Sequence, residues 1–145
     1  MPAVQTTYTA VMPIGSVGEV ADLSFSDVIS RECQPATCAF GVAVIQGTAD
    51  HQANVGGAGV FLGISVRDVS LDSRRNDAYA QYDTMGVMTK GVMFVLAGEA
   101  VVAGDIVYRT ATGALNKTAA SNTLIANARW ETTAANGALA KLRLS

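Results

Sequence analysis

Apolar and polar residues alternate with a period of two along much of the chain, and glycine or asparagine separates the alternating runs at short intervals. This period places successive side chains on opposite faces of a strand, so the pattern predicts β-strands rather than helices. Strands are predicted where the pattern is clearest, at residues 40–46, 60–66, 87–96, 98–103 and 106–110. In the third of these, Lys90-Gly91 predicts a bend or a bulge.

The C-terminus gives the clearest predicted strand pair. In residues 138–144 the even positions are all apolar, whereas Lys141 and Arg143 project to the other face. Asn136-Gly137 comes directly before this run, and this dipeptide favours a type I′ turn. Residues 128–133 are therefore expected to fold back as the antiparallel partner strand.

Turn residues separate the other runs. Gly104-Asp105 and Thr112-Gly113 predict chain reversals on either side of the strand at 106–110. Residues 67–84 are rich in charged side chains, which is typical of a solvated loop. Short strands at regular spacing, without helical patterns between them, predict an all-β single domain: a jelly-roll-like sandwich or a barrel.

The first eighteen residues differ from the rest because they contain no turn residues that would close a local hairpin. We expect residues 1–18 to form an extended N-terminal arm and residues 19–145 to form the β-sandwich or jelly-roll domain. Within the arm, the apolar residues Tyr8, Val11, Met12 and Ile14 are candidate contacts with another protein or another subunit, because an exposed strand gains main-chain hydrogen bonds on a neighbouring sheet edge. An ordinary first strand of the same domain is the alternative.

Composition adds a statement about the surface. The chain has 145 residues, which suits one domain with one core. Half of the residues are apolar, but only 15% are charged, against roughly 25% in typical soluble domains. We therefore expect much of the surface to be covered by other protein chains. The formal net charge of −2 provides no positive field for nucleic acid or anionic lipid, so neither is an expected partner.

No targeting segment is evident. The longest strongly apolar run, residues 92–97, is far shorter than the roughly twenty residues that a spanning helix needs. It is expected to be a buried strand. The N-terminus lacks the basic start and apolar stretch of a signal peptide, so synthesis and retention in the cytoplasm are expected. In a reducing compartment Cys33 and Cys38 should remain free thiols.

Residues that carry chemistry are few. His51 is the single histidine and lies in a polar segment, so we expect a solvated side chain. Cys33, Cys38 and His51 do not have the paired spacing of a metal site, and no metal is expected. The glycine-rich segment 56–59 lacks the lysine and the strand–helix context of phosphate-binding loops, so no cofactor is expected either.

One short motif suggests an enzymatic alternative. Asp105 and Tyr108 have the Asp-x-x-Tyr spacing of the small trimeric all-β dUTP pyrophosphatases, which have about this chain length. The other motifs of that family are missing from this chain. The preferred interpretation is that Gly104-Asp105 makes a turn and that Tyr108 packs or lies at an interface. A small hydrolase that uses Asp105, Tyr108 or His51 is the remaining enzymatic hypothesis.

The methionines and the single tryptophan are divided between core and interface. Met85, Met88 and Met93 lie in or beside the predicted apolar strand and are expected in the core. Met12, in the arm, is the methionine most suited to an interface. Trp130 alternates with charged neighbours along its strand and is expected to face inward.

Taken in order, five segments resemble the small cement or decoration proteins of tailed-bacteriophage heads. They are Gln5-Thr6-Thr7-Tyr8, residues 40–49 (FGVAVIQGTA), 61–68 (FLGISVRD), 128–132 (ARWET) and 137–144 (GALAKLRL). The resemblance covers nearly the whole chain, and the succession of segments carries it rather than any one motif. Two positions depart from the pattern. Asn127 stands where glycine is expected, and Lys141 stands where an apolar residue is expected.

The resemblance implies a jelly-roll or related β fold and a structural role. Such a protein coats the outer surface of the capsid in the virion and bridges neighbouring subunits of the major capsid protein. The implied partners are that protein and further copies of this chain, as a homodimer or homotrimer, with no enzymatic activity. The alternative is another phage structural component: a tail-tube, head-completion or host-recognition protein.

Overall fold

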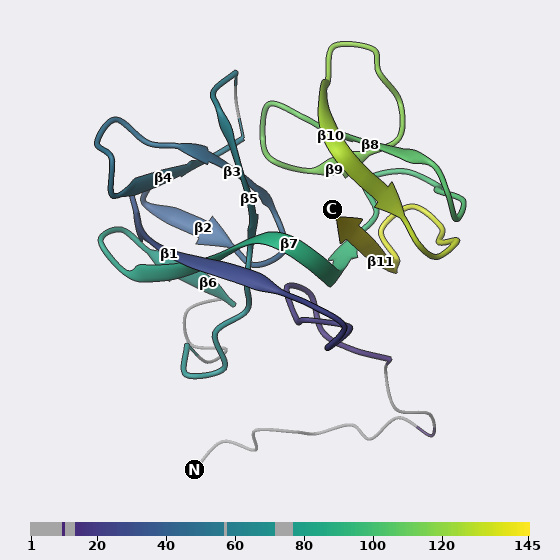
Figure 1. The fold of residues 1–145 in the computed structure, drawn as a ribbon, viewed down its shortest axis with the longest axis horizontal. Helices are drawn as coiled ribbons and strands as arrows, with labels where there is room; N and C mark the ends of the chain where they lie inside the picture. Colours follow the sequence, from purple (N-terminus) through teal and green to yellow (C-terminus); the bar gives the residue numbers. More distant parts are fainter. Residues whose placement is uncertain (1–9, 11–13, 57, 72–76) are drawn as a thin grey trace.

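The structure, a computed structural model, describes residues 10, 14–56, 58–71 and 77–145. These residues form eleven β-strands and no helix, so the predicted all-β fold is confirmed (Figure 1). The strands are β1 (Asp27–Cys33), β2 (Thr37–Ala39), β3 (Ala43–Gln46), β4 (Gln52–Val55), β5 (Phe61–Ser65), β6 (Ala78–Ala80), β7 (Thr84–Leu96), β8 (Ile106–Arg109), β9 (Leu115–Asn116), β10 (Thr123–Trp130) and β11 (Leu139–Leu144).

The long strand β7 is shared by two halves of the fold (Figure 1). The main sheet has the order β1-β4-β3-β5-β7-β11-β10-β8-β9, and β1 also pairs with β7. That second pairing closes β1, β4, β3, β5 and the first part of β7 into a ring, which we call the N-terminal barrel. The second part of β7 continues into β11, β10, β8 and β9, which we call the C-terminal sheet. A small sheet of β2 and β6 accompanies the barrel.

β7 changes partners at a bulge. Its register against β1 shifts between Asp27 and Val28, so Thr89 of β7 has no residue opposite it in the register. The hydroxyl of Thr89 donates to the C=O of Asp27 at 3.2 Å. Gly91 follows with a φ of 133° and begins the pairing with β11. The predicted irregularity at Lys90-Gly91 is therefore confirmed. It lets a single strand serve both the N-terminal barrel and the C-terminal sheet.

The predicted C-terminal hairpin is also confirmed. β10 and β11 are antiparallel, with Trp130 opposite Leu142. Ala140, Leu142 and Leu144 are buried, whereas Lys141 and Arg143 are half-exposed on the other face. The alternation of apolar and charged residues in β11 therefore correctly predicted which side chains face the core and which face outward.

The predicted type I′ turn in this hairpin is wrong. A type I′ turn needs positive φ at both central residues. Gly137 has a φ of 77°, whereas the φ of Asn136 is not positive. The reversal is closed by a bond from the N–H of Ala138 to the C=O of Ala135, at 3.0 Å. Positive φ at the second central residue alone is the pattern of a type II turn. The connection between β10 and β11 is eight residues long, so it need not match the twist that a two-residue hairpin loop requires.

Two other local predictions need correction. Residues 98–103 form no strand; Val101 makes one isolated bridge to Ala134, because Asp105 holds a tight turn directly after it. The segment 67–84 is not a loop throughout, since β6 lies within it. There Tyr79 is buried, and its hydroxyl donates to the C=O of Val66 at 2.5 Å. A single aromatic residue among charged neighbours is too short a pattern to predict a strand.

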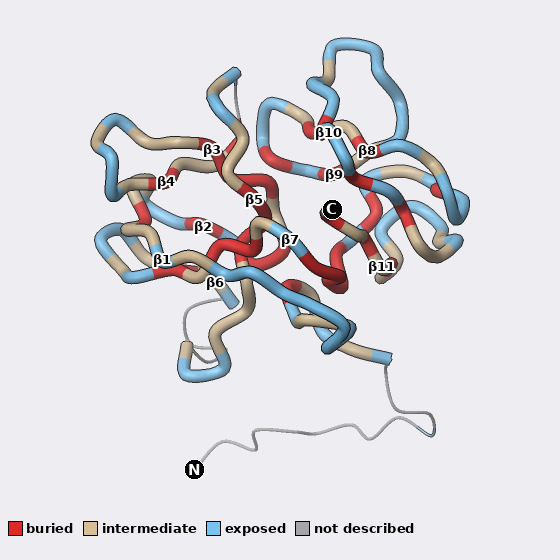
Figure 2. Tube along the Cα trace, viewed as in Figure 1, coloured by how far each residue is buried: buried red, intermediate tan, exposed pale blue. Residues whose placement is uncertain are grey.

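The buried residues form two clusters that follow the two halves of the fold. Figure 2 shows the buried positions concentrated along β7 and on the strands around it. Trp130 and Met93 are central in the larger cluster, which continues into the C-terminal sheet. The smaller cluster combines residues of the N-terminal barrel and of the small sheet, and contains Cys33, Cys38 and Met85. The predicted core positions of Trp130 and of the three β7 methionines, Met88 included, are confirmed.

Candidate functional site

The chain joins the body of the protein along an edge of β7. The N–H of Gly18 donates to the C=O of Phe94 at 2.8 Å, and the N–H of Phe94 donates to the C=O of Glu19 at 2.9 Å. Val20 completes this short ladder with an antiparallel bridge to Met93. Gly15 lies against the Phe94 ring so closely that a Cβ at this position would stand 2.5 Å from it. Residues 15–20 are therefore held against β7, and we call this segment the chain entry.

Most of the predicted contact residues lie outside the described part of the chain. Tyr8, Val11 and Met12 belong to residues that the structure does not describe. Ile14 is described, and it is 74% exposed. The role of Ile14 as a contact residue stays a prediction. The division into an arm of residues 1–18 and a domain of residues 19–145 stays a prediction.

An apolar cavity of about 360 Å³ opens close to this entry point. Its lining comes from residue 17, from the segment between β2 and β3, and from the C-terminal sheet and its loops. The lining residues are Val17, Ala39, Phe40, Gly41, Val42, Leu96, Ala97, Gly98, Ala114, Leu115, Asn136 and Gly137. None of them is charged. Leu96 is 48% exposed, so the cavity presents an apolar surface that suits an uncharged side chain of a partner.

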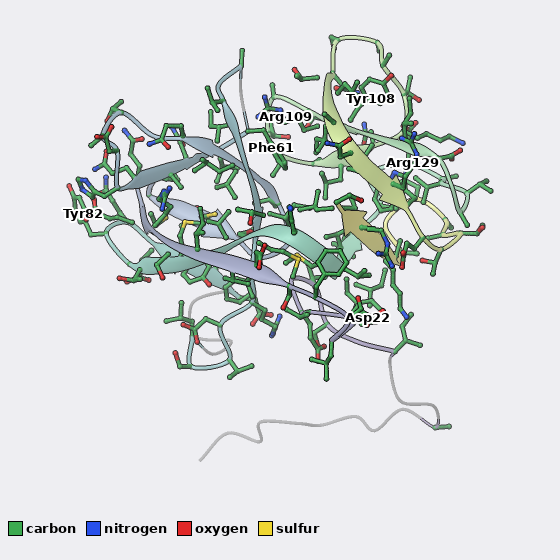
Figure 3. The ribbon with its side chains drawn as sticks, viewed as in Figure 1. Asp22, Phe61, Tyr82, Tyr108, Arg109 and Arg129 are labelled. Carbon is green, nitrogen blue, oxygen red and sulfur yellow. The ribbon has the colours of Figure 1, made fainter. Side chains whose placement is uncertain are left out.

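A buried arginine connects the two halves of the fold. Arg109 of β8 is only 4% exposed, and its Nη2 donates to the C=O of Gly59 at 2.7 Å. Its guanidinium carbon lies 5.4 Å from the ring centroid of Phe61 on β5, and Figure 3 shows the two side chains together. Within the described residues its Nε and Nη1 have no hydrogen-bond partner, and burial lowers the pKa of the group. Arg109 therefore holds the barrel against the sheet.

The two cysteines are free, as predicted, and both are buried. Burial, with the nearby charge of Asp83 as a smaller cause, raises the pKa of Cys33 to about 11. Burial, with Cys33 as a smaller cause, raises the pKa of Cys38 to about 12. A thiol with such a pKa is neutral near pH 7, so neither cysteine is an activated nucleophile. Both are packing residues of the smaller cluster.

The structure does not assemble the enzymatic candidates into a site. The Oδ2 atom of Asp105 accepts the N–H of Val102 at 2.9 Å, so this carboxylate holds a turn. Tyr108 lies on β8 and is half-buried, next to buried Val107. His51 lies in the β3–β4 turn, with its Nε2 atom 3.7 Å from Oε1 of Glu32. Across the described residues no cluster of histidine, cysteine and acidic side chains is suited to a metal ion. No helix in that part of the chain is long and apolar enough to cross a bilayer.

The described residues together define a small all-β domain with an apolar cavity lined by uncharged residues. The comparison with protein families makes the class specific. The chain belongs to the family of structural cement proteins (E217 gp24/Pam3 gp6), whose profile matches residues 4–145. It is thus a phage structural protein with a capsid-stabilising, decorating role, and the resemblance seen in the sequence is confirmed.

Solved structures with the same fold agree with this family. A chain from the capsid of Myoviridae phage XM1 is 18% identical with a TM-score of 0.81, and the match covers 99% of this chain and 98% of that one. The N base of the head fibre gp8.5 of bacteriophage phi29 is 14% identical with a TM-score of 0.56, covering 83% and 95%. At these identities the likeness concerns the fold. No curated protein matches the chain.

Sequence reasoning missed the cavity and Arg109. The cavity residues come from segments far apart in the chain, and each is an ordinary apolar or small residue. Arg109 stands in a strand where polar residues are expected to alternate outward, and no local pattern distinguishes a buried arginine from a solvated one. One signal in the sequence pointed to burial: Arg109 lies two positions after Val107, and residues two apart on a strand face the same side.

Proposed function

We propose that this protein lies on the outer surface of a phage head and bridges neighbouring major capsid protein subunits, without catalysing a reaction. Family membership supports the association with capsid proteins. The observation that carries the finer proposal is the uncharged cavity beside the point where the N-terminal segment leaves the body. An apolar, uncharged recess beside residues 15–20 suits protein contact and offers no group for acid–base chemistry.

In this proposal residues 1–18 act as an extended arm. Tyr8, Val11, Met12 and Ile14 contact the capsid or an adjacent copy, while the body covers the seam between capsid subunits. Linked contacts on one rigid body strengthen each other, because release of one contact leaves the others in place at high effective concentration. Self-association into a dimer or a trimer multiplies the contacts again. Synthesis in the cytoplasm of the bacterial host precedes assembly on the virion.

The arm is tested by deleting residues 2–14. We expect the shortened protein to keep the far-UV circular dichroism and unfolding midpoint of the full chain, since residues 15–20 still bind β7. Its binding to purified heads that lack the cement protein, measured by co-sedimentation, should weaken by about a hundredfold. Val60→Ser, at an exposed position away from the entry point, is the control and should bind as the full chain does. Unchanged binding of the shortened protein would contradict the role of the arm.

The cavity is tested separately by Leu96→Asp. This substitution places a charge in the mouth of the cavity, and because Leu96 is half-exposed it should change the free energy of unfolding by less than about 1 kcal/mol. Binding to heads should nevertheless fall by at least roughly tenfold. If Leu96→Asp binds as tightly as the unmodified chain, the cavity does not contact the capsid.

A further inference from the structure

Charge is unevenly divided between the two halves of the chain. Residues 1–83, before β7, carry nine acidic and four basic residues, a net charge of −5. Residues 84–145 carry three acidic and six basic residues, a net charge of +3, which together give the −2 of the whole chain. The first thirty residues contain no lysine or arginine at all. A nearly neutral protein thus combines an acidic part with a basic part.

The acidic part has an exposed apolar centre beside the chain entry. We call Glu19, Asp22, Leu23, Phe25, Asp27 and Val28 the acidic turn. The Oδ1 atom of Asp22 accepts the N–H of Ser24 at 2.8 Å, which shapes the turn and leaves Leu23 95% exposed. Phe25 and Val28 are exposed as well. Asp27 lies opposite Lys90 in the register of β1 and β7. The ion pairs found among the described residues include no residue of the acidic turn.

The basic part is the outer face of the C-terminal sheet. We call Ile106, Leu124, Arg129, Lys141 and Arg143 the basic face. Arg129 of β10 is the register partner of Arg143 on β11 and of Ile106 on β8. Residues directly opposite one another in antiparallel strands project to the same side of the sheet, so two guanidinium groups and an apolar residue share this face.

Internal partners neutralise only part of the basic face. Arg143 forms an ion pair with Glu131. Lys141 holds its ammonium group 5.6 Å from the ring centroid of Phe94. Arg129 donates to the C=O of Ala128 at 3.2 Å and, within the described residues, pairs with no carboxylate. An exposed guanidinium beside Ile106 and Leu124 is therefore free to meet an acidic and apolar partner.

We propose that the acidic turn of one copy docks on the basic face of a second copy. This inference rests on the self-association put forward under the proposed function, and it names the surfaces. Each copy carries both patches, and Figure 3 shows Asp22 and Arg129 at separate places on the molecule, so these two residues do not face each other within one copy. The second copy offers what each patch lacks: guanidinium groups for the carboxylates, and Ile106 and Leu124 for the apolar centre. Under a two-fold axis the contact occurs twice.

Charge reversal on each side tests the contact. Asp22→Lys and Arg129→Glu each place like charges opposite one another, so each variant alone should self-associate roughly tenfold or more weakly, measured by analytical ultracentrifugation at low salt. An equimolar mixture of the two variants should recover association, because the reversed charges are again opposite. Both positions are exposed, and equal unfolding midpoints would show that the folds are intact. Asp50→Lys, an exposed acid in the β3–β4 turn, makes the same change of net charge and should associate as the unmodified chain does.

Three outcomes would overturn the proposal: a monomeric unmodified chain at micromolar concentration, single variants that associate normally, or a mixture that stays monomeric. Binding of each variant to heads separates this failure from failure of the capsid role. If a variant loses self-association but still binds heads at high concentration, the contact between copies is supported and the cement role stands. If the unmodified chain self-associates but ignores heads, the cement role fails while the contact between copies stands.

Discussion

The N-terminal barrel and the C-terminal sheet share β7 but differ in how they are stabilised. The barrel is a closed ring of strands around a small cluster that includes two buried cysteines. In the C-terminal sheet, only an isolated parallel bridge between Leu115 of β9 and Ala97, directly after β7, links the last strand back to the first. The larger cluster around Trp130 extends into this sheet. Because the strands of the barrel pair in a closed ring, their backbone N–H and C=O groups are hydrogen-bonded to neighbouring strands. The stability of the C-terminal sheet depends more on the burial of its apolar side chains. The sheet should therefore be the half that is more sensitive to core truncation.

The two halves also differ in what they present to partners. The entry of the chain and the acidic turn belong to the part before β7, whereas the basic face belongs to the C-terminal sheet. Arg109 and the apolar cavity lie where the halves meet. A division of this kind lets one small body offer several distinct contacts at once, which is what a bridging protein requires.

Trp130→Ala should have the largest effect on stability. Trp130 is 1% exposed and is the largest fully buried side chain of the described residues, so its truncation should lower the free energy of unfolding by about 3–5 kcal/mol. Urea titration followed by circular dichroism measures the change. Met85→Ala, in the barrel cluster, is the matched comparison and should cost about 2–4 kcal/mol. If Met85→Ala lowered the free energy of unfolding more than Trp130→Ala, the C-terminal sheet would not be the half that is more sensitive to core truncation.

The barrel should be distinguished by its response to alkaline pH. Because burial raises the pKa of Cys33 from 9.0 to about 11, folding favours the neutral thiol. This stabilisation is complete below pH 9 and is lost as the pH rises towards 11, at up to about 1.4 kcal/mol per pH unit for each such thiol. The double variant Cys33→Ala, Cys38→Ala should show a flatter decline in the free energy of unfolding between pH 9 and 11. Equal slopes in the two proteins would contradict the raised thiol pKa values.

Replacing Arg109 tests the junction between the halves. Arg109 is a buried cation with one carbonyl partner and one aromatic partner. Arg109→Met keeps the length of the side chain and removes the buried charge, so the free energy of unfolding should rise by about 1 kcal/mol. Arg109→Ala leaves a cavity and should lower it by about 2 kcal/mol. If Met and Ala are equally destabilising, the hydrogen bond to Gly59 outweighs the cost of burying the charge.

The smallest expected effect is at Asn127 in β10. This residue has a φ of 59° where the family resemblance led us to expect glycine, and its C=O accepts the N–H of Ser145 at 2.9 Å. Asn127→Gly should leave the free energy of unfolding within about 0.5 kcal/mol, because glycine adopts positive φ without strain. Asn127→Ala should lower it by about 1 kcal/mol. Equal stability of the alanine and glycine variants would show that the left-handed conformation carries no cost here.

The sequence predicted the elements whose signals are local. The β10–β11 hairpin, the irregularity at Lys90-Gly91 and the buried Trp130 all follow from alternation or from a single turn residue. β1 and β4 were not predicted. Their parallel pairing, and the second pairing of β1 with β7, join residues that are distant in the chain and leave no local pattern.

The candidate site was predicted less well than the fold. Of the four predicted contact residues only Ile14 is described; it is exposed, and its contact role stays a prediction. The cavity, Arg109 and the basic face all arise from long-range strand order, which places Arg129 beside Arg143 although fourteen positions separate them. The register of a sheet, rather than composition, creates these surfaces.

The most direct test of the capsid-stabilising role uses purified heads from which the cement protein has been removed. The measurement is the temperature at which the heads release their DNA, recorded by the fluorescence of a DNA-binding dye with and without added protein. We predict that protein at a concentration just sufficient to saturate the heads raises this temperature towards that of untreated heads, and that Leu96→Asp at the same concentration raises it less. An unchanged release temperature with the unmodified protein fully bound would contradict the account.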